Sequence, residues 1–263
     1  MTANQRKEIF VMRRIITVVL SATAALFLAS CGNINGGGGK YVIATDTAFK
    51  PFEYTNKSGD FVGIDVEILD AVAKDQGFEY ELNSLGWDAA VSACQAGQAN
   101  GMIAGASITE ERRNNGWIFS DGYYTATQSM VVSATSDISG FEDLSGKTVA
   151  VKNGTLGQNY AESLKDQYGF TIAVFEDSPT MYQAVAGGQA VACFEDTPIM
   201  AASIKDEGYA LKILEDTANE GADYGFVVFS EDNRELLDRF NAGLANIKKN
   251  GKYDEILNKY LGE

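Results

Sequence analysis

The chain has 263 residues, 45% hydrophobic and 22% charged, which is typical of a globular protein and enough for two lobes of ordinary size. Its formal net charge of −15 argues against a nucleic-acid-binding surface, which needs clustered basic residues. The absence of histidine excludes Ser-His-Asp and Cys-His catalysis and every histidine-ligated metal site. The three cysteines contain no C-x-x-C pair, so neither a zinc site nor a disulfide framework is indicated.

The first 39 residues have the pattern of a targeting segment followed by a tether. Two arginines precede a mostly apolar run, residues 15–29, which is too short to span a bilayer as an ordinary helix. The run ends in LASCG, which resembles the lipobox of bacterial lipoproteins, where the chain is cleaved before the cysteine, here Cys31, and the cysteine is acylated. A plain secretory signal is the alternative. We expect a lipoprotein signal peptide over 1–30, with Met12 as an alternative start, and a flexible glycine-rich tether over 31–39.

From Lys40 onward, short β-rich runs alternate with helical patterns. Strands are expected, in chain order, at 41–46, 78–82, 101–105, 147–152, 171–177, 190–196 and 224–229. Helices are expected at 63–77, at 87–95, after an N-cap at Thr109, at 156–169, from an N-cap at Ser178, at 198–207, at 234–249 and at 253–262. This alternation predicts parallel sheets covered by helices, and therefore an α/β protein.

The stretch GFEDLSGKT, residues 140–148, is close to a phosphate-binding loop. Five residues separate its glycines where the motif has four, and its Lys-Thr pair precedes a strand where the motif needs a helix. We interpret it as a turn before a strand.

Small residues and a cation follow the strand expected at 101–105. Ala104, Gly105 and Ser107 would let a ligand approach the backbone, and Arg112 near a helix start could pair with a carboxylate. The alternative is that Arg112 is an ordinary solvated helix residue, as we expect for Arg113.

Other polar and aromatic residues fall at the expected ends of strands, where open α/β sheets bind ligands. Asp46 and Asp196 follow strands, although either could cap a turn or helix, and Lys152 ends a strand, where a lysine is usually solvated. Phe49 and Trp87 lie near the same strand ends, where aromatics more often belong to the core. Together these side chains offer a cation, carboxylates and an apolar wall, the set that an α-amino acid requires. Cys94 and Cys193 are expected to be buried thiols.

The chain from 40 to 261 resembles the bacterial extracytoplasmic solute-binding proteins of ABC transporters for polar amino acids, and especially the glutamine-binding members. The motifs that carry this resemblance are ATDTAFKPFE, FVGIDVEILDAVAK, AGASITEERR, IFSDGYY, GKTVAVKNGT, EDTP and YGFVVF. The resemblance implies the type II periplasmic-binding-protein-like fold, in which two α/β lobes joined by two crossing strands close on a ligand. Lobe 1 would comprise 40–125 and 221–263, and lobe 2 would comprise 126–220.

The resemblance also implies roles for individual residues. Arg112 would bind the ligand α-carboxylate, with Gly105, Ser107 and Thr155 beside it, and Asp196 would bind the α-ammonium. Asp46, Phe49, Trp87 and Lys152 would surround the ligand side chain. The glutamine binders have histidine where this chain has Glu195, which would favour a basic ligand or would pair with Lys152. The residues expected to bind the ligand are Asp46, Phe49, Trp87, Ala104, Gly105, Ser107, Arg112, Lys152, Thr155, Glu195 and Asp196.

The function expected from the sequence is a lipid-anchored, monomeric extracytoplasmic receptor that delivers a polar amino acid, glutamine first, to an ABC permease. No catalytic residue, cofactor or metal is expected. Two alternatives remain open: a dehydratase for an amino-acid precursor on the same fold, with Glu195 as a general acid, and the sensor lobe of a signalling system.

Overall fold

The computed structural model describes residues 39–262, which form one compact unit from Lys40 onward. The predicted signal peptide, tether and Cys31 lie outside the described residues. Within 39–262, no helix has the length and apolar character needed to cross a membrane.

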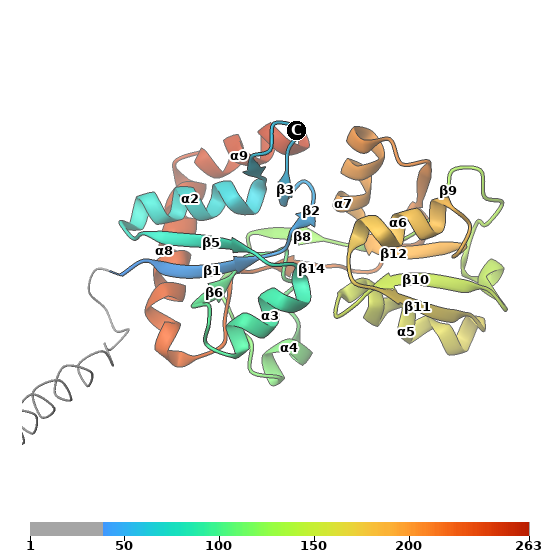
Figure 1. The fold of residues 1–263 in the computed structure, drawn as a ribbon, viewed down its shortest axis with the longest axis horizontal. Coiled ribbons are helices and arrows are strands. Elements are labelled where there is room, and N and C mark those ends of the chain that lie inside the picture. The colour runs from blue at the N-terminus through green and yellow to red at the C-terminus, as the bar shows by residue number, and fades with distance from the viewer. Residues whose placement is uncertain (1–38, 263) are drawn as a thin grey trace, which may run out of the picture. The chain divides into compact units, whose positions relative to one another are not determined.

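Lobe 1 is built around a five-stranded sheet with strand order β5-β1-β6-β15-β7 (Figure 1). Its strands are β1 (Tyr41–Thr45), β5 (Tyr80–Ser84), β6 (Gly101–Met102), β7 (Ile118–Phe119) and β15 (Val227–Val228). One face packs on α2 (Ile64–Gln76), α8 (Arg234–Lys249) and α9 (Lys252–Leu261), and the other packs on α3 (Trp87–Gln95) and lies near α4 (Glu110–Asn114). A small sheet of β2 (Ala48–Phe49), β3 (Glu53–Thr55) and β4 (Phe61–Val62) joins β1 to α2.

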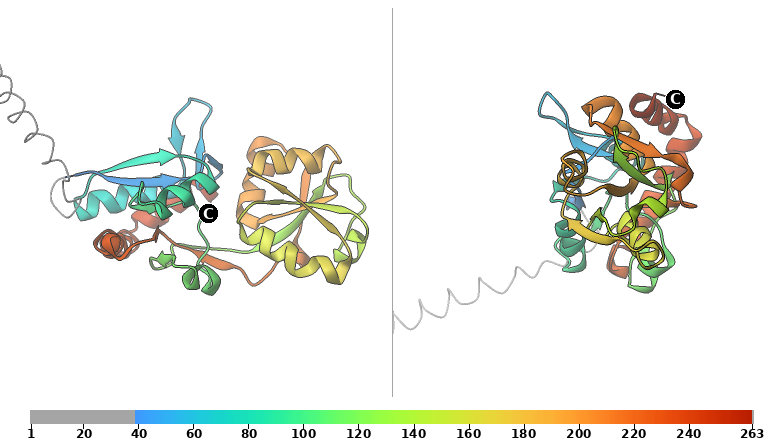
Figure 2. Two further views of the ribbon diagram at one scale, coloured as in Figure 1. Left: turned by 60° about the horizontal axis from the view of Figure 1, so that its bottom comes forward. Right: turned by 90° about the vertical axis from the view of Figure 1, so that its right-hand side faces the viewer.

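Lobe 2 repeats this plan with strand order β11-β10-β12-β9-β13. Its strands are β9 (Gln128–Ser133), β10 (Thr148–Lys152), β11 (Thr171–Phe175), β12 (Ala192–Asp196) and β13 (Leu211–Leu214). Helix α5 (Leu156–Tyr168) packs on one face, while α6 (Ser178–Ala186) and α7 (Thr197–Ala202) pack on the other (Figure 2). Short helical turns complete the chain at Phe141–Leu144, Ser203–Glu207, Glu215–Thr217 and Glu231–Asn233.

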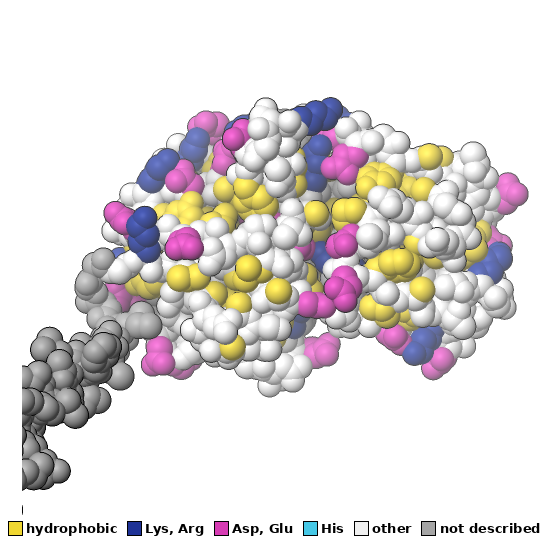
Figure 3. Space-filling view, in the orientation of Figure 1, with side chains coloured by type: hydrophobic (Ala, Val, Ile, Leu, Met, Phe, Trp, Pro, Cys, Tyr) yellow, Lys and Arg dark blue, Asp and Glu magenta, His cyan; other side chains and the backbone are white. Residues whose placement is uncertain are grey.

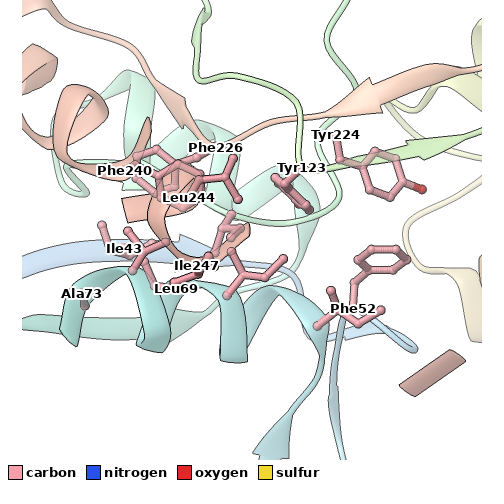
Figure 4. Packing of buried hydrophobic residues seen from close by; sticks show 14 of the residues in the cluster. Ile43, Phe52, Leu69, Ala73, Tyr123, Tyr224, Phe226, Phe240, Leu244 and Ile247 are labelled. Carbon is pink, nitrogen blue, oxygen red and sulfur yellow. The ribbon is translucent and has the colours of Figure 1, made fainter. Parts of the chain in front are cut away.

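Two antiparallel strands, β8 (Tyr124–Ala126) and β14 (Ala222–Tyr224), run between the lobes. Next to them the lobe 1 core is aromatic: the ring of Phe52 lies 5.1 Å from that of Tyr224, and Tyr123 lies beside both (Figure 4). The double crossing explains why the predicted parallel sheets also contain antiparallel strands. Strand β9 enters lobe 2 and β15 returns to lobe 1 directly from the crossing strands, and each pairs antiparallel with its neighbours.

Most predicted elements are confirmed, and the differences are local. Strands β9 and β13 and the short strands β2, β3, β4, β7 and β8 were missed. The strand expected at 101–105 ends at Met102 because the chain then turns into the cavity wall. The helix expected at 198–207 is α-helical only to Ala202 and continues as a π-helical turn. Residues 141–144 form a 3₁₀ turn before β10, which confirms the interpretation of 140–148. Cys94 and Cys193 are buried free thiols, as expected.

Candidate functional site: a cavity between the lobes

A cavity lies where strand ends of both lobes meet. It contains about 320 Å³ of space free of protein atoms, part of it open to solvent. Its wall contains Leu156 and all eleven residues predicted to bind a ligand: Asp46, Phe49, Trp87, Ala104, Gly105, Ser107, Arg112, Lys152, Thr155, Glu195 and Asp196. The fold therefore brings the whole predicted set around one space, from segments as far apart in sequence as β1 and β12.

Arg112 is held in place by its own helix and by lobe 2. The hydroxyl oxygen of Thr109 caps α4 and accepts from the Arg112 backbone N–H at 3.1 Å, as predicted. The guanidinium donates from Nη1 to the Ser107 carbonyl at 2.9 Å and from Nη2 to the Gly154 carbonyl at 3.0 Å. Because Gly154 belongs to lobe 2, this side chain links the two lobes at the cavity.

The guanidinium also faces two neighbouring indole rings. Its central carbon is 5.1 Å from the ring centroid of Trp87 and 4.9 Å from that of Trp117, which is a cation–π arrangement. Burial lowers the pKa of Arg112 to about 10, against the opposing effect of Asp196, so the group remains charged at neutral pH. Among residues 39–262, Arg112 forms no salt bridge. Arg113 is exposed, as predicted.

Gly105 forms the tight turn beside Arg112. Its φ of +54° lies in the left-handed region, and an added Cβ would come within 2.5 Å of Cε1 of Phe49, so only glycine fits here. The Gly105 N–H donates to Oδ2 of Asp65 at 2.8 Å and is therefore directed into the protein. Ala104 and Ser107, on either side of the turn, are almost fully buried in the cavity wall.

Asp196 ends β12 and faces the cavity from lobe 2. Its Oδ1 accepts from Nε2 of Gln128 at 2.6 Å, and its Oδ2 accepts from the hydroxyl of Tyr224. The alternative that Asp196 caps a helix is wrong, because its side chain makes no capping hydrogen bond to α7. Burial and the neighbouring Glu195 raise the pKa of Asp196 to about 7, although Tyr224, Gln128 and Arg112 act in the opposite direction. In the described part of the chain this carboxylate has no salt-bridge partner.

Lys152 and Asp46 form a salt bridge across the cleft, with both side chains less than 5% exposed. The Lys152 ammonium also lies 5.1 Å from the ring centroid of Phe49. Burial disfavours the charged lysine, but Asp46 and then Glu195 outweigh it, so the pKa of Lys152 is raised and the group stays protonated. The alternative of a solvated lysine at this strand end is therefore wrong.

Glu195 is turned toward its own lobe. Its Oε2 accepts from the Ser178 hydroxyl at 2.8 Å and from the Tyr182 hydroxyl at 2.7 Å, and its Oε1 accepts from the Asp196 N–H at 2.9 Å. The expected N-cap at Ser178 is wrong: Asp177 caps α6 by accepting from the Thr180 N–H, which leaves the Ser178 hydroxyl for Glu195. Glu195 forms no salt bridge with Lys152.

Thr155 caps α5 at the cavity edge. Its hydroxyl donates to the Lys152 carbonyl at 2.8 Å and accepts from the Gln158 N–H at 3.3 Å, so this structure uses it within lobe 2. Sequence reasoning missed six residues that position the predicted ones: Asp65, Trp117, Gln128, Ser178, Tyr182 and Tyr224. They lie on other elements, and no local pattern links them to the site.

Further contacts between the lobes surround the cavity. Nδ2 of Asn153 donates to Oδ2 of Asp88 at 2.7 Å, and the ammonium of Lys50 lies 3.1 Å from Oδ2 of Asp206. Figure 3 shows acidic side chains on both lobes of one face, in keeping with the net charge. The cross-cleft contacts describe a closed arrangement of the lobes.

A two-lobed fold with a polar cavity between closing lobes defines a class of ligand-binding proteins. The chain belongs to the bacterial extracellular solute-binding proteins, family 3, whose family model matches residues 41–263. It is an amino-acid-binding protein of this family. A relative in Bacillus subtilis (strain 168), the arginine-binding extracellular protein ArtP, is 29% identical over 257 residues, covering 95% of this chain and 98% of the relative.

Solved structures share this fold. The Lactococcus lactis GlnP substrate-binding domain 2 in open conformation is 38% identical, covers 87% of this chain and 98% of its own, and superposes with a TM-score of 0.60. An ancestral arginine-binding protein bound to glutamine is 32% identical, with coverage of 87% and 100%, and superposes with a TM-score of 0.79. One further neighbour, 32% identical with coverage of 84% and 95% and a TM-score of 0.75, is an ancestral amino-acid-binding protein described as a precursor of cyclohexadienyl dehydratase.

Proposed function

We propose that this protein is a lipid-anchored extracytoplasmic receptor that binds L-glutamine between its lobes and delivers it to an ABC permease. The observation that carries the proposal is the distribution of charge in the cavity. Arg112 and Asp196 have no salt-bridge partner among residues 39–262, whereas Lys152 and Asp46 neutralise each other. A ligand with a zwitterionic head and a neutral polar side chain complements this pattern.

The zwitterionic head of an amino acid suits the first pair of residues. The guanidinium of Arg112 would take the α-carboxylate, since a planar fork of donors matches the two carboxylate oxygens. The carboxylate of Asp196 would take the α-ammonium, which would lower its raised pKa again. Ser107 and Gly105 would lie against the backbone of the ligand, and Thr155 would lie near its carboxylate.

A carboxamide suits the second pair. Its N–H₂ group donates and its carbonyl accepts, so it would fit between the Asp46 carboxylate and the Lys152 ammonium without breaking their charge balance. The guanidinium of a bound arginine would face repulsion from Lys152. Glu195, which would otherwise favour a cation, is already held by the hydroxyls of Ser178 and Tyr182.

A basic amino acid is the second candidate. Glu195 and Asp46 both line the cavity, and relatives such as the arginine-binding protein of Bacillus subtilis are named for that ligand. Isothermal titration calorimetry with glutamine, arginine, lysine, histidine and glutamate tests both candidates. We expect glutamine to bind at micromolar or tighter affinity, about −8 kcal/mol or better. Tighter binding of arginine than of glutamine would show that the ligand is a basic amino acid.

The dehydratase alternative requires a free general acid in the cleft. Glu195 accepts three hydrogen bonds and is not poised to donate a proton, which argues against that role. Incubation with prephenate or arogenate should give no turnover. A sensor role would instead require a signalling partner in place of a permease.

The anchor, the monomeric state and the lobe boundaries at 125/126 and 220/221 are further parts of the proposal. Metabolic labelling with a fatty acid should acylate the wild-type chain and leave a Cys31→Ala variant unlabelled. Absence of label in the wild type would indicate a plain secreted protein. Labelling of the variant would show that Cys31 is not the acylated residue.

A further inference from the structure

Two buried carboxyl groups lie behind the cavity wall with no complete set of partners. Glu53 on β3 and Asp65 in the first turn of α2 are both 0% exposed. Both side-chain oxygens of Glu53 and Oδ1 of Asp65 lack a hydrogen-bond donor, although the two carboxyl groups face each other within hydrogen-bonding range. Unsatisfied buried polar atoms are costly, so three at one place require an explanation.

The backbone forces the two carboxyl groups together. The Asp65 N–H donates to the Phe52 carbonyl at 2.9 Å, one residue before Glu53. Gly63 permits this approach: an added Cβ would lie 1.9 Å from the same carbonyl oxygen, and its φ of +144° disfavours any other residue. The start of α2 is therefore fixed against β3, and neither carboxyl group can move away without disrupting both elements.

We propose that Glu53 is a neutral carboxylic acid that donates a hydrogen bond to Asp65, and that this pair positions the Gly105 turn of the ligand site. One proton then satisfies the Oδ1 of Asp65 and gives Glu53 a partner. Asp65 is the ionised member, because it accepts from the Gly105 N–H and the Tyr123 hydroxyl, both at 2.8 Å, and lies in the first turn of a helix.

The surrounding charges agree with this assignment. Burial raises the pKa of Glu53 well above its usual range, followed by the nearby carboxylates of Asp65 and Asp46, and only Lys152 acts in the other direction. The pKa of Asp65 rises only to about 6, because Gly105 and Tyr123 stabilise its charge against burial. These opposite tendencies place the shared proton on Glu53.

The pair connects the ligand site to the strands between the lobes. Through Asp65 it holds Gly105, which packs against the ring of Phe49 and precedes Ser107 by two residues. Through the Tyr123 hydroxyl it holds the residue directly before β8. Glu53 is not in the cavity wall, so it acts as a positioning residue for ligand binding.

Carboxyl-carbon NMR of protein labelled at the glutamate side chains tests the proton directly. At pH 7.5 we expect one glutamate signal at the position of a protonated carboxyl group, and we expect it to be absent in Glu53→Gln. The variant Glu81→Gln, at an exposed site, should instead lose an ionised signal. A wild-type spectrum in which every glutamate is ionised would overturn the proposal.

Matched variants test the positioning role. Glu53→Gln keeps a donor toward Asp65 and should bind glutamine within about threefold of wild type, whereas Glu53→Ala should bind at least about tenfold more weakly.

Thermal stability gives a second test. The wild type should lose thermal stability as the pH rises from 7.5 to 10, because the raised pKa of Glu53 in the folded state stabilises the fold only while Glu53 keeps its proton. Glu53→Gln should lose less stability over the same range. Equal damage by both variants would contradict the role. The affinity comparison rests on the proposed function, but the NMR and stability results do not. If Glu53→Ala fails to fold, the NMR and stability measurements on the wild type and Glu53→Gln still test the proposal.

Discussion

The two ends of the cavity differ in whether their charged side chains are paired. At one end, Arg112 faces two indole rings and Asp196 is hydrogen-bonded to neutral donors, and neither charge has a counter-ion in the described chain. At the other end, Lys152 and Asp46 pair, and Glu195 accepts three hydrogen bonds. Buried charges without a partner are costly, so the first end is built for a ligand that brings both charges. The charges at the second end already balance each other, so this end favours a ligand group that carries no net charge.

The largest expected effect comes from removing a charge at the first end. Arg112→Ala, or Asp196→Ala, should abolish calorimetrically detectable binding of every amino acid, because each leaves one charge of the ligand buried and unpaired, a loss of about 3–5 kcal/mol. Arg113→Ala is the matched control and should remain within about 0.5 kcal/mol of wild type, because Arg113 is exposed. Retained binding in Arg112→Ala would show that Arg112 does not bind the α-carboxylate of the ligand.

Breaking the balance at the second end should change selectivity. Lys152→Met leaves Asp46 unpaired beside the ligand side chain, so glutamine should bind about 2–5 kcal/mol more weakly and arginine should bind better than it does to wild type. Lys147→Met, at an exposed lysine before the other end of β10, is the control and should change neither affinity. A uniform loss for both ligands would mean that Lys152 serves folding and not selectivity.

The pH dependence of binding reports on Asp196. Its pKa of about 7 in the unoccupied site must fall when an ammonium binds, so affinity is complete above pH 7 and declines as the pH falls below it. At pH 6 glutamine should bind about tenfold more weakly than at pH 8, with proton release detectable from the buffer dependence of the binding enthalpy. Asp65 titrates only near pH 6, so the range above that value isolates Asp196. Constant affinity across this range would show that Asp196 is ionised before the ligand binds.

A smaller effect is expected from the hydroxyls that hold Glu195. Ser178→Ala combined with Tyr182→Phe frees this carboxylate toward the cavity, so the ratio of arginine to glutamine affinity should rise about tenfold, the equivalent of 1.4 kcal/mol. Tyr209→Phe is the control, because Tyr209 packs on Tyr182 without bonding Glu195. An unchanged ratio would show that Glu195 has no influence on selectivity.

The sequence predicted the residues of the cavity far better than their contacts. Asp46, Lys152 and Asp196 end strands, and strand ends converge in α/β folds, so their gathering could be foreseen. The sequence could not reveal that Trp117 covers Arg112 or that Gln128 and Tyr224 hold Asp196, since these contacts join segments far apart in the chain. The strand at β15 was predicted but its antiparallel direction was not, and β9 was missed altogether. Strand direction depends on the crossing between lobes, which periodicity does not record.

One calorimetric comparison tests the central claim most directly: titration of the wild-type protein at pH 7.5 with glutamine, glutamate, arginine and 4-aminobutanamide, which keeps the carboxamide and the ammonium but lacks the α-carboxylate. The account predicts that glutamine binds at micromolar or tighter affinity, that glutamate and arginine bind at least about tenfold more weakly, and that 4-aminobutanamide does not bind detectably. Tighter binding of arginine or glutamate than of glutamine would contradict the claim that Lys152 and Asp46 balance the charge around the ligand side chain. Binding of 4-aminobutanamide at an affinity close to that of glutamine would contradict the claim that Arg112 binds the α-carboxylate.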